Sequence, residues 1–331
     1  MSEYYLENGT NETGADYVDV FFRTGVWECV VAVVGAPANL LVVCLAASLL
    51  TRAGTGERAR KTYNHYYVLS MAAADLLFCS VHAPLYGLMY VWQLDYSFPV
   101  CRALYVLTHM STVSSSLSLL CLNVDKFVAV HKPLHHGLIM SRRTALALLA
   151  AAWAVSGSWA VLLTCGPLTT MPEPCRVALR HELVYYTFAV LFFVLPILLS
   201  FLVALYVALV TARSGRSASL HSSWGADDDD RAGTYLRHSR RNRGRSTLDK
   251  YKWRARTLTF VFCTTIWSTI TSIPYRTSFV LRIYRISSVE LSMFLFGLMA
   301  ANALGNPFIT LTTQTQYRSR LAKCCGRIRN P

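Results

Sequence analysis

The chain has 331 residues, of which 53% are hydrophobic and only 15% are charged, and its mean hydropathy is +0.35. Soluble domains carry about 25% charged residues, so this composition excludes an ordinary soluble domain and indicates an integral membrane protein. A formal net charge of +14 is typical of nucleic-acid binding only in a soluble chain, so nucleic acid is not expected as a partner.

The N-terminal segment, residues 1–26, is expected to form a short extracellular tail. It is acidic and polar and lacks the apolar core of a cleavable signal peptide, so we expect the first membrane helix to act as its own insertion signal. Two acceptor triplets for N-glycosylation begin at Asn8 (Asn-Gly-Thr) and Asn11 (Asn-Glu-Thr). We predict that both asparagines are glycosylated.

Seven apolar segments follow, each long enough to cross a hydrocarbon core of about 30 Å as a helix that rises about 1.5 Å per residue. Their expected limits are 27–51, 63–93, 101–124, 144–166, 183–211, 256–281 and 289–312. The sequence therefore predicts an all-α membrane protein, a seven-transmembrane helix bundle over residues 27–312. The one long connection, 212–255, is polar and of low complexity, which predicts a disordered loop.

The distribution of Lys and Arg predicts the orientation of the chain. If residue 1 is outside, the inner segments 52–62, 125–143, 212–256 and 313–331 hold 25 of the 32 Lys and Arg residues. Basic residues accumulate on the cytoplasmic side of membrane proteins. We therefore expect a protein of the plasma membrane with an extracellular N-terminus and a cytoplasmic C-terminus, whose positive charge mostly faces the lipid headgroups.

The cysteines agree with this orientation. Cys101 lies at the outer end of the third segment and Cys175 in the loop after the fourth, both on the oxidising side, which favours a disulfide between them. Cys324 and Cys325 follow the seventh segment in a basic, amphipathic stretch, which favours palmitoylation. A zinc site is not expected, because no Cys or His pairs have ligand spacing.

Asp75 is the one acid that the sequence places deep within an apolar segment, where ionisable residues are costly and usually functional. Expected partners at a similar depth in the membrane are Asn39, Ser115, Asn302 and Asn306. Carboxylate and neutral oxygens suit a hard cation, so an allosteric sodium ion is one interpretation and a protonated carboxyl in a hydrogen-bond network is the other. No further cofactor is expected.

The stretch from Cys101 to Pro133 carries no charged residue from Ala103 to Val124 and has Ser and Thr at many interior positions. Small hydroxylated residues allow helices to approach closely and bond to backbone carbonyls. We expect this helix to be buried among the others.

The order and spacing of several motifs resemble those of rhodopsin-like (class A) G-protein-coupled receptors over almost the whole chain. The marks are Asn39, Asp75, Cys101, Asp125-Lys126-Phe127, Trp153, Pro196 and Asn306-Pro307, one or two in each of six segments. The resemblance implies a receptor that binds an extracellular ligand and signals to a heterotrimeric G protein by helix rearrangement. It also implies a short amphipathic eighth helix over 314–325, within a cytoplasmic segment 313–331.

Two departures from the family pattern affect the expected G-protein switch, which comprises Asp125, Lys126, Phe127 and Pro307. Lys126 stands where the family has the arginine of Asp-Arg-Tyr, and lysine offers a point charge in place of a planar fork. Thr310 stands where the family has the tyrosine of Asn-Pro-x-x-Tyr. An atypical or decoy receptor without ordinary coupling is therefore the alternative. An enzyme is not expected, because no nucleophile–base or metal constellation is present.

The ligand pocket is predicted by the same resemblance. Thr108, followed by His109, stands where amine receptors have an aspartate, and residues 289–312 contain no lysine for retinal, so neither ligand is expected. Arginines at the outer end of the sixth segment suit a carboxylate or phosphate, or they are rim charges that pair with acids such as Glu290. The predicted pocket residues are Thr108, His109, Trp92, Tyr185, Arg276 and Arg282.

Overall fold

The computed structural model describes residues 14–51, 63–94, 96–165, 169–173, 176–179, 187, 190–224, 258–278 and 288–329. The elements are α2 (Gly14–Thr51), α4 (Tyr63–Leu77), η1 (Phe78–His82), α5 (Ala83–Val91), α6 (Phe98–His131), α7 (His136–Ile139), α8 (Arg142–Cys165), β1 (Thr169–Glu173), β2 (Arg176–Leu179), η2 (Val190–Val194), α10 (Leu195–Trp224), a helix over 258–278, α12 (Val289–Thr313) and α13 (Thr315–Arg329).

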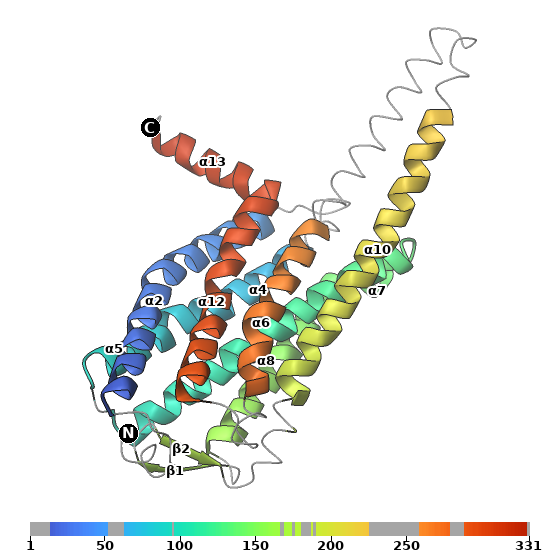
Figure 1. The fold of residues 1–331 in the computed structure, drawn as a ribbon. Coiled ribbons are helices and arrows are strands. Elements are labelled where there is room, and N and C mark those ends of the chain that lie inside the picture. Colours follow the sequence, from blue (N-terminus) through green and yellow to red (C-terminus); the bar gives the residue numbers. More distant parts are fainter. Residues whose placement is uncertain are drawn as a thin grey trace.

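Long helices form a single bundle (Figure 1). In the described part of the chain, 6 helical stretches are long and apolar enough to cross a membrane, and the helix over 258–278 lies between α10 and α12. Together they confirm the predicted seven-helix bundle. The antiparallel hairpin of β1 and β2 lies at the end of the bundle where α2 begins, here called the hairpin end. The opposite end, where α12 passes into α13, is called the α13 end.

Helix α6 is the centre of the bundle, as the hydroxyl-rich stretch predicted. It packs against α4, α8, α10 and both short wide-turn segments, η1 and η2. Its buried serines bond to carbonyls of their own helix, as Ser111 Oγ does to Thr108 O at 3.1 Å and Ser118 Oγ to Ser114 O at 2.7 Å. Ser70 of α4 lies 2.9 Å from Ser118 and accepts a 2.9 Å hydrogen bond from Trp153 Nε1 of α8, which joins three helices.

The first helix begins earlier than the sequence predicted. It is continuous from Gly14, so residues 14–26 belong to the helix and not to an irregular tail. The apolar side chains of this part give the reason, because Phe21 packs on Tyr90 of α5 with ring centroids 5.2 Å apart. Arg23 and Asp19 pair one turn apart on the exposed side of the same helix.

The fifth membrane helix also differs from its expected limits. Helix α10 continues to Trp224, so the prediction of a disordered segment is wrong for residues 212–224, while residues 225–255 lie outside the described part. The segment 212–224 contains only one glycine and no proline, so nothing in it stops a helix that has already started.

Two π-helical segments were not predicted, and each ends two residues before a proline. In η1 the backbone N–H of Ala83 donates to Phe78 O, five residues back, and Pro84 follows; η2 ends at Val194 and Pro196 follows. Proline removes a hydrogen bond and its ring clashes with the carbonyl four residues earlier, and a wider turn relieves that clash. The two prolines in the sequence therefore account for both segments, but they did not predict that the distortion would be a π-helical turn.

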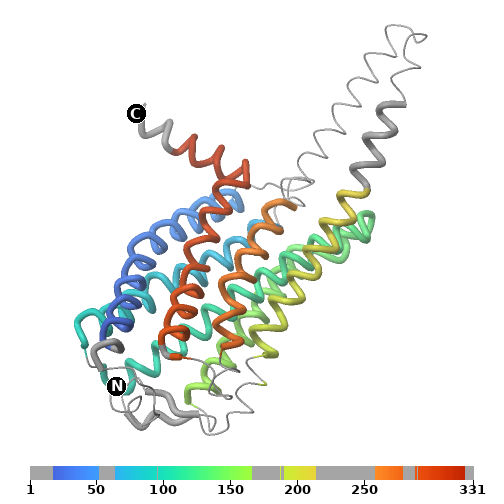
Figure 2. Tube along the Cα trace, viewed as in Figure 1, coloured from blue at the N-terminus to red at the C-terminus, as the bar shows by residue number. Residues whose placement is uncertain are grey.

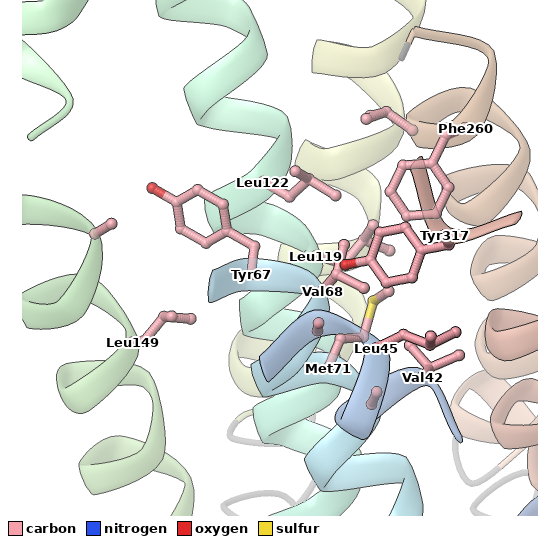
Figure 3. Packing of buried hydrophobic residues seen from close by; sticks show 14 residues of the cluster. Val42, Leu45, Tyr67, Val68, Met71, Leu119, Leu122, Leu149, Phe260 and Tyr317 are labelled. Carbon is pink, nitrogen blue, oxygen red and sulfur yellow. The ribbon is translucent and has the colours of Figure 1, made fainter. Parts of the chain in front are cut away.

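A hydrophobic cluster fills the α13 end of the bundle (Figure 3). Tyr317 of α13 points into it beside Phe260 and Leu119 and is 1% exposed. Burial raises the pKa of the Tyr317 hydroxyl well above its usual range, and the hydroxyl is hydrogen-bonded to His65 Nδ1 at 3.1 Å. Arg320 donates two hydrogen bonds to Ser48 of α2. These contacts hold α13 as it turns away from α12 after Gln314 (Figure 2).

Candidate functional site: a polar cavity and a charge cluster

A cavity of about 20 Å³ lies inside the bundle, walled by α4, η1, α6, η2, α10, the helix over 258–278 and α12. It is lined by one acid, one arginine, five hydroxylated side chains and one amide, together with apolar groups such as Phe78, Phe193 and Met299. A cavity of this size accommodates about one water molecule or a similarly small group. A polar space enclosed by helices is where a seven-helix protein binds ligands or ions.

Asp75 forms one boundary of the cavity and is 4% exposed. Asn306 Nδ2 of α12 donates to Asp75 Oδ2 at 2.7 Å, which joins α4 to α12 across the bundle. Ser115 and Asn302, two more of the predicted partners, line the same cavity. Asn39 does not, because its amide donates to Gly35 O at 3.0 Å and to Ala303 O at 2.9 Å.

The oxygen atoms around Asp75 fit a small hard cation. Asn306 Oδ1 is buried and has no hydrogen-bond partner among the described residues, so it is a free acceptor beside the carboxylate. Asn302 Oδ1, in contrast, accepts from Ser268 Oγ at 3.0 Å and from Thr271 Oγ1 at 3.4 Å. A carboxylate, a hydroxyl and an orphaned amide oxygen are the donor types that such an ion prefers.

Arg276 lines another part of the same cavity and is 7% exposed. One guanidinium nitrogen donates to Thr112 Oγ1 of α6 at 3.1 Å. The Phe193 ring of η2 lies under the guanidinium, with 3.7 Å between Arg276 Cζ and the ring centroid. The planar cation is thus fixed by one side-chain hydrogen bond and one stacked ring, within range for a cation–π interaction.

The other predicted pocket residues differ in their positions. Thr108 Oγ1 lies 2.5 Å from His82 Nδ1 and donates to Leu104 O, and His109 packs edge-on against Phe193, so both border the cavity wall without lining the cavity. Trp92 is 62% exposed at the end of α5 and does not reach the cavity. Tyr185 and Arg282 lie outside the described residues.

A cluster of directly paired charges lies nearer the α13 end, at the predicted G-protein switch. Lys126 Nζ donates to Asp125 Oδ2 at 2.6 Å and also to Asn64 of α4. His136 Nε2 of α7 lies 3.0 Å from the other oxygen, Asp125 Oδ1. Both members of the Asp125–Lys126 pair are buried, so the whole carboxylate is satisfied by partners from α6 and α7.

The remaining switch residues take ordinary helical positions. The Phe127 ring stacks on His131, and its centroid lies 5.5 Å from that of the Tyr206 ring of α10. Pro307 lies inside α12. Thr310 Oγ1 donates to Asn306 O of its own helix at 2.8 Å, so its hydroxyl bonds within α12.

The predicted modification sites are only partly described. Cys101 is disulfide-bonded, but its predicted partner Cys175 lies outside the described residues, so the pairing stays a prediction. Asn8 and Asn11 also lie outside them. Cys324 is an exposed free cysteine on α13, as palmitoylation requires, whereas the side chain of Cys325 is not described.

Sequence reasoning missed two groups, a buried acid and a half-buried histidine. Glu28 of α2 is fully buried, and neither carboxylate oxygen has a hydrogen-bond partner among the described residues, so Asp75 is not the only acid inside the bundle. An acid between Trp27 and Cys29, next to an apolar run, was the available signal. His136 was missed because nothing in the sequence indicates that α7 folds back toward Asp125.

Comparison with known proteins agrees with the seven-helix membrane bundle that the structure shows. Residues 39–309 match the family described as 7 transmembrane receptor (rhodopsin family). The chain is 27% identical over 304 residues to the G-protein coupled receptor aex-2 of Caenorhabditis elegans, a match that covers 90% of this chain and 82% of that protein.

Two further relatives match over shorter regions. The D(4) dopamine receptor of Homo sapiens is 31% identical over 197 residues (57% of this chain, 46% of the receptor), and the muscarinic acetylcholine receptor M5 of Rattus norvegicus is 26% identical over 236 residues (68% and 43%). The chain thus spans less than half the length of these two relatives. Because the family match covers most of the chain, the protein is a multi-pass membrane protein and belongs to the rhodopsin family of G-protein-coupled receptors.

Proposed function

We propose that this receptor binds an extracellular ligand and transmits the signal to a heterotrimeric G protein by rearrangement of the helices that wall the polar cavity. The observation that carries the proposal is the Asp75–Asn306 hydrogen bond, which ties the cavity to α12 in the middle of the bundle. A ligand that favours one arrangement of these helices shifts the population between two states of the bundle.

The charge cluster of Asp125, Lys126, His136 and Asn64 is the proposed resting-state lock. Its four groups come from α6, α7 and α4, so movement of any of these helices relative to another breaks a buried polar contact. Breaking a buried charged contact costs several kcal/mol unless a partner replaces it, and the G protein is the proposed replacement.

Second-messenger output tests this proposal. Cells that express the wild type, Lys126→Ala or Lys126→Arg at equal surface level are compared for basal cAMP and calcium, with Lys132→Ala as a control because Lys132 is exposed six residues away. We expect the wild type to signal, Lys126→Ala to change the output at least about twofold, and Lys132→Ala to match the wild type. Equal output from Lys126→Ala and the wild type contradicts the lock.

A second candidate, a receptor that binds its ligand without ordinary coupling, is favoured by one observation. Lys126 is bonded to both Asp125 and Asn64, and a lysine point charge makes fewer directed contacts than the arginine fork of the family. A silent wild type beside an active Lys126→Arg variant supports this candidate.

We further propose that the chain lies in the plasma membrane with its N-terminus outside. The acceptors Asn8 and Asn11 and the basic segment 313–331 support this orientation. Glycosidase treatment of the expressed protein is expected to increase its gel mobility, and an Asn8→Gln, Asn11→Gln variant is expected to show no such change. An unchanged wild-type mobility argues against the glycosylated outer tail.

We also propose that a sodium ion binds beside Asp75, held by the carboxylate with Ser115 and Asn306 oxygens. Such an ion supplies a fixed positive charge that steadies the packing around a buried carboxylate. Replacing sodium by N-methylglucamine at constant ionic strength is expected to lower the thermal unfolding midpoint of the purified wild type but not that of Asp75→Asn. Equal midpoints in both salts contradict the proposal.

A further inference from the structure

We propose that Glu28 is a proton-binding site of the receptor and that the bound proton favours the packed arrangement of α2 in this structure. The inference goes beyond the proposed function, because it depends on neither the ligand nor the G protein. Trp27, the neighbour of Glu28 on α2, donates from Nε1 to Gly297 O of α12 at 2.8 Å. Gly297 lies about two turns from the start of α12, so Glu28 lies inside the bundle on the side of the hairpin end.

The missing hydrogen bonds of Glu28 are the first argument. The residue is 0% exposed, and neither Oε1 nor Oε2 has a hydrogen-bond partner among the described residues. The other two buried acids in the described part of the chain differ, because Asp75 accepts from Asn306 and Asp125 pairs with Lys126. An ionised carboxylate without a partner in an apolar interior is so costly that the group takes up a proton instead.

The cationic side chains near α2 are the second argument. Helix α2 packs against α4, η1, α5 and α12, and none of these four elements contains a Lys or Arg. Arg23 of α2 itself pairs with Asp19 on the exposed side. Helix α13 also packs on α2, but through Arg320 and Ser48 at the α13 end. No Lys or Arg in the described ranges therefore neutralises Glu28.

The other ionisable side chains of the packed helices do not bind Glu28 either. The thiols of Cys29 and of Cys79 in η1 are near enough to interact with its charge, but a thiol is neutral or negative. The histidines bond elsewhere, since His65 Nδ1 lies 3.1 Å from the Tyr317 hydroxyl and His82 Nδ1 lies 2.5 Å from Thr108 Oγ1. The remaining groups are tyrosines and acids: Tyr63, Tyr66, Tyr67 and Asp75 of α4, Tyr86 and Tyr90 of α5, and Glu290 of α12.

The tight packing around Glu28 favours a proton over a larger cation. Helices α2 and α5 meet through glycines on the turns beside it, because a Cβ at Gly25 would lie 2.7 Å from Tyr90 Cβ and a Cβ at Gly87 would lie 2.6 Å from Cys29 Sγ. The polar cavity described above does not include Glu28. A metal ion needs several oxygen ligands and the space to hold them, whereas a proton binds to one carboxylate oxygen.

Release of the proton requires a change in this packing. An ionised Glu28 needs water or a cation, and the contacts of Gly87 and Trp27 hold α5 and α12 against α2 beside it. The proton-bound receptor therefore populates the packed arrangement, and the proton-free receptor populates a looser, hydrated one. Glutamate in water releases its proton near about pH 4.3, so above this pH the native receptor holds a proton that the unfolded chain has lost, and stability falls as the pH rises.

Thermal unfolding of the purified full-length receptor from about pH 5 to about pH 8 tests the inference. Glu28→Gln is the main variant, because glutamine has the shape of the protonated acid and cannot ionise. We expect the wild-type midpoint to fall by at least about 5 °C relative to that of Glu28→Gln over this range, and Glu28→Gln to be the more stable protein at the upper end. Parallel pH profiles of the two proteins overturn the proposal.

Two further variants assign the effect to Glu28. Glu28→Leu also has no ionisable group, so we expect it to show the profile of Glu28→Gln, and it replaces that variant in the comparison if the glutamine protein does not fold. Glu290→Gln is the matched control, because Glu290 is an exposed glutamate in the first turn of α12, and it is expected to keep the wild-type profile. A change in Glu290→Gln as large as that in Glu28→Gln overturns the assignment.

A comparison of sodium with N-methylglucamine at about pH 8 and constant ionic strength separates a proton from a metal ion. A sodium ion beside Asp75 stabilises the wild type and Glu28→Gln alike, so we expect equal sodium effects in the two proteins. A larger sodium effect in the wild type indicates a cation at Glu28 and overturns the proton site. Ordinary signalling without any pH effect of Glu28 keeps the proposed function and removes this inference, and a pH effect of Glu28 in a silent receptor does the reverse.

Discussion

The two polar regions of the bundle, the cavity and the charge cluster, differ in how their buried charges are bonded. At the cavity, Asp75 accepts a hydrogen bond from the Asn306 amide, and Arg276 donates one to the Thr112 hydroxyl. In the charge cluster, Asp125 pairs directly with Lys126 at 2.6 Å and lies 3.0 Å from His136 Nε2. The carboxylate of Asp75 thus borders a polar cavity, whereas the carboxylate of Asp125 is enclosed by its own charged partners.

Removing the acid of the charge cluster is expected to have the largest effect. Asp125→Ala leaves Lys126 buried without its 2.6 Å partner and is expected to destabilise the purified receptor by about 3–5 kcal/mol, because an uncompensated buried charge is costly. Denaturation of the receptor in detergent measures the change. Asp19→Ala, which breaks the exposed pair with Arg23, is the control and is expected to cost less than about 1 kcal/mol. Similar losses in both variants contradict a paired, buried cluster.

The helix contact between the two regions is expected to tolerate no added bulk. A Cβ at Gly305 of α12 would overlap the Trp267 indole, so Gly305→Ala forces the indole or the helix aside and is expected to cost about 1–3 kcal/mol. Gly157→Ala is the matched control, because its Cβ meets only Met110 Sδ at 3.8 Å. Unfolding midpoints of the two variants are compared; a loss for Gly157→Ala as large as that for Gly305→Ala refutes the close contact.

The smallest effect is expected at the edge of the α13 end. Tyr317→Phe keeps the ring in the hydrophobic cluster and removes the hydrogen bond to His65, which is expected to cost about 0.5–1.5 kcal/mol. Tyr206→Phe is the control, since Tyr206 is 41% exposed and its hydroxyl has no hydrogen bond within the described ranges. Unfolding measurements in which Tyr317→Phe equals the control show that the hydroxyl adds nothing.

Much of the fold was predictable because membrane helices follow from length and hydropathy. The helical limits failed where a second physical cause acted. Helix α2 begins at Gly14 because apolar residues of its first turns pack on α5, and α10 continues to Trp224 because no residue stops it. A hydropathy window reports only local apolarity. It therefore misses packing between distant segments, and it ends a helix where the sequence becomes polar even if no residue stops the helix.

Less of the candidate site was predictable. Asp75, Ser115 and Asn302 line one cavity, as their similar depth in the segments indicated, whereas Arg276 lines it too although the sequence indicated only an outer-end charge. Asn39 bonds to backbone carbonyls, and Trp92 lies away from the cavity, because side-chain direction is not contained in sequence spacing. Phe193 beneath Arg276 and His136 beside Asp125 depend on the relative rotation of helices, which no local pattern records.

The two π-helical segments give the cavity a means of changing its lining. Phe78 belongs to η1 and Phe193 to η2, and both side chains line the cavity. If a wide turn tightens into an α-turn, every residue beyond it on the same helix rotates by about 100°, one residue's share of a helical turn. Such a register slip within η2 swings Phe193 away from Arg276 while both helices remain folded. The width of the turn in η2 therefore determines whether Phe193 faces the cavity.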